Sequence, residues 1–440
     1  MLERFNEFLW GFPLLGLILG TGVLLTVWTG FAQVRLFPAA CRDFWRRLRS
    51  RDSGFRALCT ALAATVGTGN IAGVAGAIAI GGPGAVFWMW VSAFFGLAVK
   101  FAEGVLAVRY RMPDGRAGPM YIIQGGLGKR WQWLGWLYSF FGIIAAFGVG
   151  NATQVNAVIT ALQSTGVSRG FVQVTGLGLA IAVALMVMGG AKRITEAAQM
   201  LVPVVSGVYI LLCVAALGLR WEQLGAALAG IIRGAFEPRA VTGGAVAGMM
   251  TAVRIGVARG TFTNEAGMGT AAIAHGGAEV DHPVRQGLMG IMEVFLDTMV
   301  ICTLTALVIL TSGICIPYGT GVGAELTSGA LAVAFGPWVR GALSGCLVLF
   351  ALATILGWGF YAGRCAEYLF GHINWMLFGI LQGGTVLLGL YLKTQTVWSL
   401  AEIFNGLMAV PNLLAVLMLS REVRRLTRQW EVCYNRHHRK

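Results

Sequence analysis

The segment ATVGTGNIAGVAG, residues Ala64–Gly76, interrupts an apolar stretch long enough to cross a membrane. The segment contains four glycines and the polar run Thr68–Gly69–Asn70. Glycine is a poor helix former, and hydrocarbon offers an opened backbone no hydrogen-bond partner. Irregular backbone at membrane depth is tolerated only where it is buried in protein or lines a cavity. The segment therefore predicts a broken membrane helix beside a cavity.

The composition indicates a multi-pass membrane protein. Of the 440 residues, 57% are hydrophobic and 12% are charged, whereas a soluble domain carries about 25% charged residues. The mean hydropathy is +0.72. The net charge of +14 lies mainly in short loops and the tail, where it orients helices, so we expect no nucleic-acid partner. The eight cysteines and five histidines have no metal-ligand spacing, and we expect no resident cofactor.

Windows of about 20 mostly apolar residues predict roughly eleven membrane spans in an all-α integral membrane fold. Their bounds are 11–32, 57–80, 84–109, 134–162, 170–190, 198–219, 241–275, 283–312, 338–363, 372–392 and 395–420. The expected units are an extra N-terminal helix with a basic loop (1–56), a first half (57–219), a connector (220–240), a second half (241–420) and a basic tail (421–440).

Loop charge predicts the orientation of the spans. The arginine-rich loop 33–56 is expected to be cytoplasmic, and with eleven spans the other basic loops and the tail fall on the same side. The loop 313–337, whose only charge is Glu325, falls outside. The connector 220–240 is the main exception, and we interpret it as an external interfacial amphipathic helix. The N-terminus is then external and the C-terminus cytoplasmic, in a membrane of the bacterial inner-membrane type.

The two halves have a feature in common. Setting the first span aside leaves ten spans, five in each half, and this odd number gives the halves the opposite orientation of an inverted repeat. The first span of the second half is also interrupted, by RGTFTNEAGMGT at Arg259–Thr270. Breaks at matching positions of two halves indicate a transport site. Close helix packing through Gly69 and Gly73 is the alternative interpretation of the first break.

Unwound backbone predicts the kind of ligand. Free N–H groups at the start of a half-helix attract a carboxylate, and free carbonyls attract a cation or an ammonium group. A small zwitterion such as an amino acid suits both kinds of backbone group.

Asn151 and Gln154 share a helix face, where they either bind the substrate or bond a neighbouring helix. Thr354 and Trp358 share another helix face. The Thr354 hydroxyl suits Na⁺, and the Trp358 indole suits the wall of an apolar pocket. The alternative for the threonine hydroxyl is a bond to its own backbone.

Ionisable side chains on predicted spans are functional candidates. Glu293 and Asp297 share a helix face. The pairs Lys100–Glu103 and Arg364–Glu367 have the spacing of local ion pairs, and we expect them to be paired.

Several motifs, in order along nearly the whole chain, resemble one transporter family. They are TALAATVGTGNIAGVAGAIAIGGPGAVFWMWVSAFFGLAVKFAEGVLAVRYR, GPMYII, GNATQVN, ARGTFTNEAGMGTAAIAH, MEVFLDTMVICTLTALVIL and ATILGWGFYAGRCAEYLFG. The sequence is similar to the alanine or glycine:cation symporters, the sodium:alanine symporter family. The resemblance implies a LeuT-type core of five plus five helices with one extra N-terminal helix.

The resemblance also implies site residues. Gly69 and Asn70 would contact the substrate carboxylate, and Gln154 would reach the substrate from the third core helix. The Phe262 carbonyl would take the ammonium group, and the adjacent Thr263 is counted with the substrate-binding residues.

The remaining implied residues form a pocket wall and an ion site. Trp358 would close the side-chain pocket, and Thr354 with carbonyls near Val66 would hold the sodium ion. The chain departs from the family pattern at Ala353, where serine is usual, and in WGFYAG, where WSYYGE is usual. These departures face or adjoin the ion site, so a proton-coupled variant is the alternative to sodium coupling.

The sequence therefore predicts a symporter that takes up alanine or glycine with Na⁺ by alternating access. A channel is the weaker alternative, and no repeated filter loop is present in the sequence. An enzyme is not expected, because Glu293 and Asp297 are the only candidate pair of catalytic groups.

Overall fold

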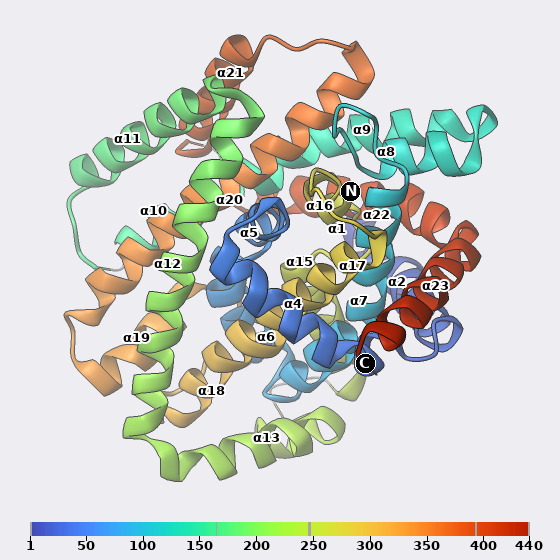
Figure 1. Cartoon of the computed structure of the whole chain (residues 1–440). Coiled ribbons are helices and arrows are strands. Elements are labelled where there is room, and N and C mark those ends of the chain that lie inside the picture. The colour runs from blue at the N-terminus through green and yellow to red at the C-terminus, as the bar shows by residue number, and fades with distance from the viewer. Residues whose placement is uncertain (1, 164, 245–247, 392–393, 439–440) are drawn as a thin grey trace.

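A computed structural model describes residues 2–163, 165–244, 248–391 and 394–438 of the chain. Every regular element in these ranges is a helix (Figure 1). The N-terminal region forms α1 (Leu2–Leu9), α2 (Phe12–Trp28), α3 (Ala32–Arg35) and α4 (Phe37–Ser50). The connector contains η5 (Trp221–Gln223), α13 (Leu224–Phe236) and α14 (Pro238–Val241).

The first half begins with a broken helix and continues with long ones. Its elements are α5 (Ser53–Thr65), the π-helix η1 (Gly69–Gly73), α6 (Val74–Gly81), α7 (Gly84–Arg109), α8 (Pro119–Ile122), η2 (Ile123–Leu127), η3 (Lys129–Trp131), α9 (Gln132–Ala145), η4 (Ala146–Ala152), α10 (Thr153–Gln163), α11 (Arg169–Met188) and α12 (Gly190–Leu219).

The second half also begins with a broken helix. Its elements are α15 (Met249–Asn264), α16 (Thr270–His275), α17 (Pro283–Val294), the π-helix η6 (Phe295–Cys302), α18 (Thr303–Thr311), α19 (Ala324–Phe335), α20 (Val339–Phe370), α21 (Trp375–Gly389) and α22 (Thr394–Met418), followed by the tail helix α23 (Ser420–His438). Helix α19 lies in the segment 313–337 that we expected to be an external loop.

The number of membrane spans remains a prediction. Among the described residues, seven helices are long and apolar enough to cross a membrane, or up to nine if each of two bent pairs is one span. The expected spans 241–275 and 372–392 are not among them, because α15 has 16 residues and α21 has 15. The inverted repeat also remains a prediction, although the first helix of each proposed half is the broken one.

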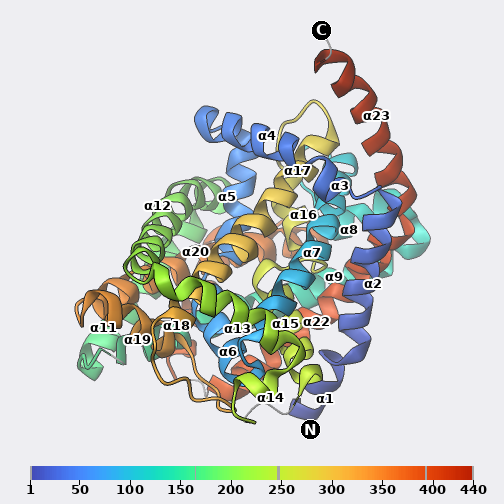
Figure 2. The same cartoon turned by 90° about the horizontal axis from the view of Figure 1, so that it is seen from below.

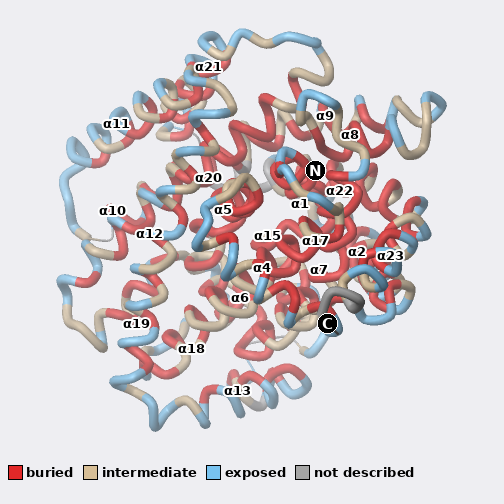
Figure 3. Tube along the Cα trace, viewed as in Figure 1, coloured by how far each residue is buried: buried red, intermediate tan, exposed pale blue. Residues whose placement is uncertain are grey.

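The broken helices lie inside a shell of other helices. Helices α5, α7, α15 and α17 are buried in the middle, whereas α11, α13 and α21 expose one face (Figure 3). The apolar window of α7 is 83% buried, but that of α11 is only 33% buried. Helix α7 packs against both α15 and α17. Figure 2 shows α2 and α23 together at one edge of this bundle.

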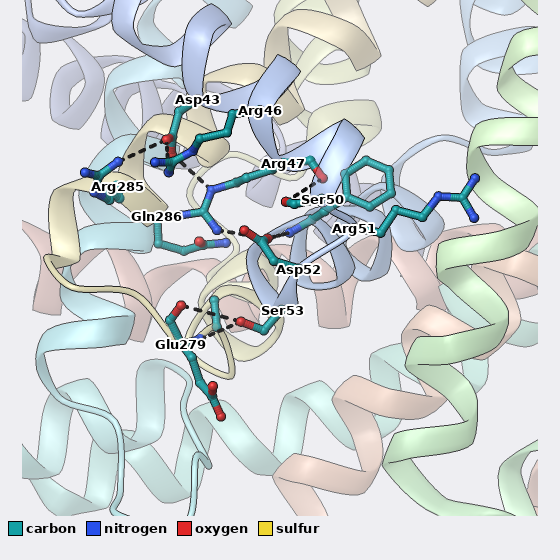
Figure 4. A network of polar contacts seen from close by, with 12 residues as sticks. Asp43, Arg46, Arg47, Ser50, Arg51, Asp52, Ser53, Glu279, Arg285 and Gln286 are labelled. Atoms are coloured by element: carbon teal, nitrogen blue, oxygen red, sulfur yellow. Dashed lines mark hydrogen bonds and ion pairs between the residues drawn. The ribbon is translucent and has the colours of Figure 1, made fainter.

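Polar contacts join the basic loop to the bundle (Figure 4). Asp43 of α4 accepts hydrogen bonds from Arg46, from Arg47 at 3.0 Å and from Arg285 of α17 at 3.1 Å. Asp52 caps α5 by accepting from the Phe55 N–H at 3.0 Å. Burial raises the pKa of Asp52, but the Phe55 N–H and Arg47 outweigh it, so this pKa lies below its usual value. The contacts fix where α5 begins, and α5 runs from there to the first break.

Candidate functional site

The first break lies at Val66–Thr68, as the glycine pattern predicts. Helix α5 ends at Thr65, Val66 is extended, and the chain resumes as the π-helix η1. The two limbs, 53–65 and 69–81, are bent by 51°. The Asn70 side-chain oxygen accepts a hydrogen bond from the Gly67 N–H at 2.8 Å, so it closes the opened turn from within. The backbone is irregular here at the centre of the bundle.

Asp297 of η6 anchors the first break and links it to the second half. The Asn70 amide donates to the Asp297 carboxylate at 2.7 Å. Thr298 also donates to this carboxylate, at 2.8 Å, and Thr298 in turn accepts from Asn264 at 3.1 Å. Since Asn264 is the last residue of α15, the chain of bonds runs from one break to the other. Helical spacing alone places Asp297 on a face with Glu293 and does not reveal this link.

The second break lies at Glu265–Gly269, where the sequence also predicts one. Glu265, Gly267 and Gly269 have positive φ values of 54°, 93° and 77°. Glycine is required at position 269, because a Cβ there would lie 2.3 Å from Pro119. The Glu265 carboxylate accepts from the Thr270 hydroxyl at 2.6 Å, which ties the two sides of the break together.

A buried carboxylate of α7 holds the backbone of the second break. Glu103 accepts from the N–H groups of Gly267 at 3.1 Å and Gly269 at 3.2 Å. Asn412 of α22 donates to the same oxygen at 2.7 Å and to the Gly267 carbonyl at 2.8 Å. These N–H groups precede α16, where a helix attracts negative charge. The protein therefore supplies its own anion at this half-helix.

Lys100 pairs with a different carboxylate from the one we predicted. Its ammonium lies 2.8 Å from Glu293 of α17, and both side chains are fully buried. Glu293 also bonds His275 at 2.9 Å. The predicted local pair of Lys100 with Glu103 is therefore wrong, because the Glu103 carboxylate bonds the backbone of the second break. The Arg364–Glu367 pair is confirmed, at 2.7 Å.

Thr354 faces the first break with an unsatisfied hydroxyl. Its oxygen is buried and has no hydrogen-bond partner among the residues that the structure describes. A Cβ on Gly67 would lie 2.5 Å from this oxygen, so the hydroxyl points at the Gly67 backbone beside Val66. Hard cations such as Na⁺ take hydroxyl and carbonyl oxygens, and both kinds lie here. Ala353 is buried next to Thr354 and offers no oxygen from its side chain.

Gln154 reaches the first break, whereas Asn151 does not. The Thr68 hydroxyl donates to the Gln154 side-chain oxygen at 2.8 Å. Asn151 donates to Gln382 and to Thr385 of α21, so it bonds a neighbouring helix. Trp358 is 1% exposed, and its indole N–H has no partner within the described ranges.

Phe262 and Thr263 lie in the last turn of α15 but face different surroundings. The Thr263 hydroxyl donates to the Gly260 carbonyl at 2.9 Å, while its methyl group faces Gly69. The Phe262 ring meets Trp10 edge-on with ring centroids 6.5 Å apart. Six of the expected site residues thus meet at the first break: Val66, Gly69, Asn70, Gln154, Thr263 and Thr354. The Phe262 ring lies apart from them.

Two pockets lie on opposite sides of the first break. One of about 300 Å³ is lined by Gly73 and Gly76 beyond the break, and by α10, Arg259 and residues 321–325. The other, of about 260 Å³, is lined by Ala57 and Thr60 before the break, and by α12, α16 and α20. Helix α19 packs over η1 beside the first pocket, and Thr327 donates to the Ile71 carbonyl at 3.1 Å. Along the chain, the break therefore lies between the residues of the broken helix that line the two pockets.

Comparisons with known proteins match nearly the whole length of the chain. A family model described as the sodium:alanine symporter family matches residues 1–440. A Haemophilus influenzae "Uncharacterized transporter" is 42% identical over 96% of this chain and 94% of its own. The "Sodium/alanine symporter AgcS" of Methanococcus maripaludis is 41% identical over 96% and 94%. The "Probable sodium/glutamine symporter GlnT" of Bacillus subtilis is 38% identical over 95% and 87%.

A solved structure has a similar fold. The chain resembles MhsT, crystallised in complex with L-phenylalanine, with a TM-score of 0.56 at 16% sequence identity. The match covers 85% of this chain and 88% of that one. At this identity the likeness concerns the fold alone, and it supports the expected LeuT-type arrangement of helices.

Proposed function

The chain belongs to the sodium:alanine symporter family, and from this premise we propose that it takes up a small neutral amino acid, alanine or glycine, together with Na⁺. It is a multi-pass membrane protein of an amino-acid transporter family. The substrate, the coupling ion, the external N-terminus and the cytoplasmic C-terminus are parts of the proposal.

The unsatisfied Thr354 hydroxyl at the first break is the observation that carries the sodium site. A buried hydroxyl without a partner costs about 1–3 kcal/mol, which an ion bound to its oxygen offsets. Thr354 and the carbonyls near Val66 supply the oxygens, and the ion would join α20 to the end of α5. Because Ala353 contributes no hydroxyl, backbone carbonyls supply most of the ligands.

The substrate site is assigned to the same break. Glu103 already holds the N–H groups at the second break, so the substrate carboxylate goes to the positive end of η1, near Gly69 and Asn70. The Phe262 carbonyl takes the ammonium group, and Gln154 and Trp358 bound the side-chain space. The substrate and Na⁺ then contact neighbouring residues of one unwound segment, which couples their binding.

Uptake into proteoliposomes tests the proposal. Alanine and glycine uptake are measured under an imposed Na⁺ gradient and, separately, under a proton gradient, with glutamine as a larger competitor. We expect Na⁺-driven uptake of alanine or glycine. Uptake driven by the proton gradient alone would show that the transporter is coupled to protons and not to Na⁺. Uptake that is indifferent to both gradients contradicts symport.

A further inference from the structure

A groove lined by arginines lies where the last membrane helix passes into the tail. Its volume is about 610 Å³, and its lining residues, which we call the arginine groove, are Trp28, Arg421, Arg424, Arg425, Arg428 and Gln429. Helix α23 bends away from α22 by 57° and packs against α2, α7 and α17. Figure 2 shows α2 and α23 side by side at the edge of the bundle.

Three of the four arginines are not paired with a carboxylate within the described ranges. Arg425 bonds Glu422 at 2.6 Å, and Arg109 of α7 bonds the same carboxylate at 3.3 Å. Arg421, Arg424 and Arg428 have no acidic partner in the part of the chain that the structure describes. They follow a spacing of three and four residues, so they project from one face of α23.

The position of these arginines makes the binding of an anion more favourable. Arg421 and Arg424 lie in the first two turns of α23, where positive side chains oppose the helix macrodipole. Val423, Leu426 and Trp430 are buried against the protein, so the arginine face cannot turn inward. A bound anion would offset both the mutual repulsion of the arginines and the unfavourable dipole.

An exposed apolar stripe leads from the membrane to the arginine groove. Gly16, Gly20, Val23 and Val27 of α2 are all exposed and are spaced by three or four residues, so they form one face. Val27 is 66% exposed and directly precedes Trp28 of the groove. Tryptophan is enriched at the membrane interface. The ligand that fits is apolar along α2 and anionic at α23.

We propose that the arginine groove binds the headgroup phosphate of an anionic phospholipid, whose acyl chains lie along the exposed stripe of α2. Basic pockets beside membrane helices on the cytoplasmic side recognise such headgroups. The bound lipid would anchor α23 to α2 and fix the direction in which α22 leaves the membrane.

Native mass spectrometry of the purified protein in detergent tests this, with phosphatidylglycerol and phosphatidylcholine as probes. We expect retention of phosphatidylglycerol over phosphatidylcholine. Each arginine contributes about fivefold, so the triple variant R421Q/R424Q/R428Q loses roughly a hundredfold in retention. The matched control K129Q/R130Q/R193Q removes three exposed charges elsewhere and retains the lipid. The variant R421K/R424K/R428K keeps the charge and most of the binding.

The wild-type protein alone can overturn the proposal, so it stays testable if the triple variant does not fold. Equal retention of the two lipids by the wild type contradicts it. Thermal stabilisation by inorganic phosphate equal to that by phosphatidylglycerol assigns the groove to soluble anions instead. Loss of retention in the control variant as large as in R421Q/R424Q/R428Q also contradicts it, because the effect then follows net charge.

Discussion

Gly67 leaves room for the Thr354 hydroxyl at the first break. A Cβ on Gly67 would lie 2.5 Å from the Thr354 hydroxyl oxygen. A Cβ at that distance forces the backbone or the hydroxyl to move. The same contact that makes glycine necessary also brings the Thr354 oxygen to the backbone, so one residue sets the geometry of the proposed ion site.

Gly67→Ala is therefore expected to abolish Na⁺-driven uptake and to lower the melting temperature. The double variant Gly67→Ala/Thr354→Ala is expected to recover stability, since the Thr354 Cβ lies 3.7 Å from the added atom, but not Na⁺ dependence. Gly178→Ala is the control, because its added Cβ meets nothing within 4 Å. Normal uptake by Gly67→Ala would remove Thr354 from the ion site.

Asn70 and Gln154 are expected to differ from Asn151, although all three are buried amides. Asn70→Ala and Gln154→Ala should each lose most alanine binding, measured by isothermal titration, because both side chains bond the first break. Asn151→Ala should lose stability but keep binding, because its partners are on α21. If Asn70→Ala and Gln154→Ala both bind normally, the substrate pocket lies elsewhere.

The two broken helices are held by carboxylates from different neighbours. Asp297 of η6 holds the first break through Asn70, and Glu103 of α7 holds the second. Glu103 accepts directly from two backbone N–H groups of the second break, whereas at the first break Asp297 holds the Asn70 side chain, whose oxygen accepts from the Gly67 N–H. These bonds explain how irregular backbone persists inside the bundle. The π-helical form of η1 and η6 places both elements off the regular helical register at this junction.

Glu103→Ala should destabilise the second break by about 1–3 kcal/mol, since the N–H groups of Gly267 and Gly269 lose their acceptor. Hydrogen–deuterium exchange should rise at residues 265–275 and stay unchanged at residues 66–70. Glu103→Gln keeps an acceptor oxygen and should have a smaller effect. Glu222→Ala, an exposed carboxylate removed, serves as the control. Unchanged exchange at residues 265–275 would show that Glu103 does not hold the break.

At the scale of the whole molecule, a different pocket lies against each limb of the first broken helix. The pocket that includes Arg259 and the pocket that includes Lys192 are lined by different halves of the broken helix. Motion of that helix against its surroundings would open one approach as the other closes, as alternating access requires. A bound substrate shifts this equilibrium only if its affinity differs between the two states.

Cysteine accessibility measures this exchange. In a background without the eight native cysteines, Ala157→Cys and Ala191→Cys report on the two pockets. We expect an impermeant thiol reagent to reach them from opposite sides, and Na⁺ with alanine to change their rates in opposite directions. Thr320→Cys and Arg49→Cys, both at exposed positions, should react at constant rates. Rates that rise and fall together would favour a channel.

Local sequence patterns predicted where the helices break, because glycine and polar residues inside an apolar stretch leave the backbone few alternatives in a membrane. The family followed from the resemblance of several motifs along nearly the whole chain, among them those around Gly69 and Glu265, and the family model matches residues 1–440. The same patterns placed Lys100 with Glu103 by spacing, and this was wrong. Spacing reports neighbours on one helix and says nothing about which other helix lies opposite.

The partners of the breaks depended on packing between segments far apart in the chain. Asn70 meets Asp297, Lys100 meets Glu293, and Glu103 meets Asn412, and no local pattern relates the members of these pairs. A buried charge or an opened N–H group must be satisfied, but any helix that comes within reach can satisfy it. The sequence by itself therefore determined that these groups need partners, because their residue types are polar or charged. Only the packing of the helices decided which residue each partner is.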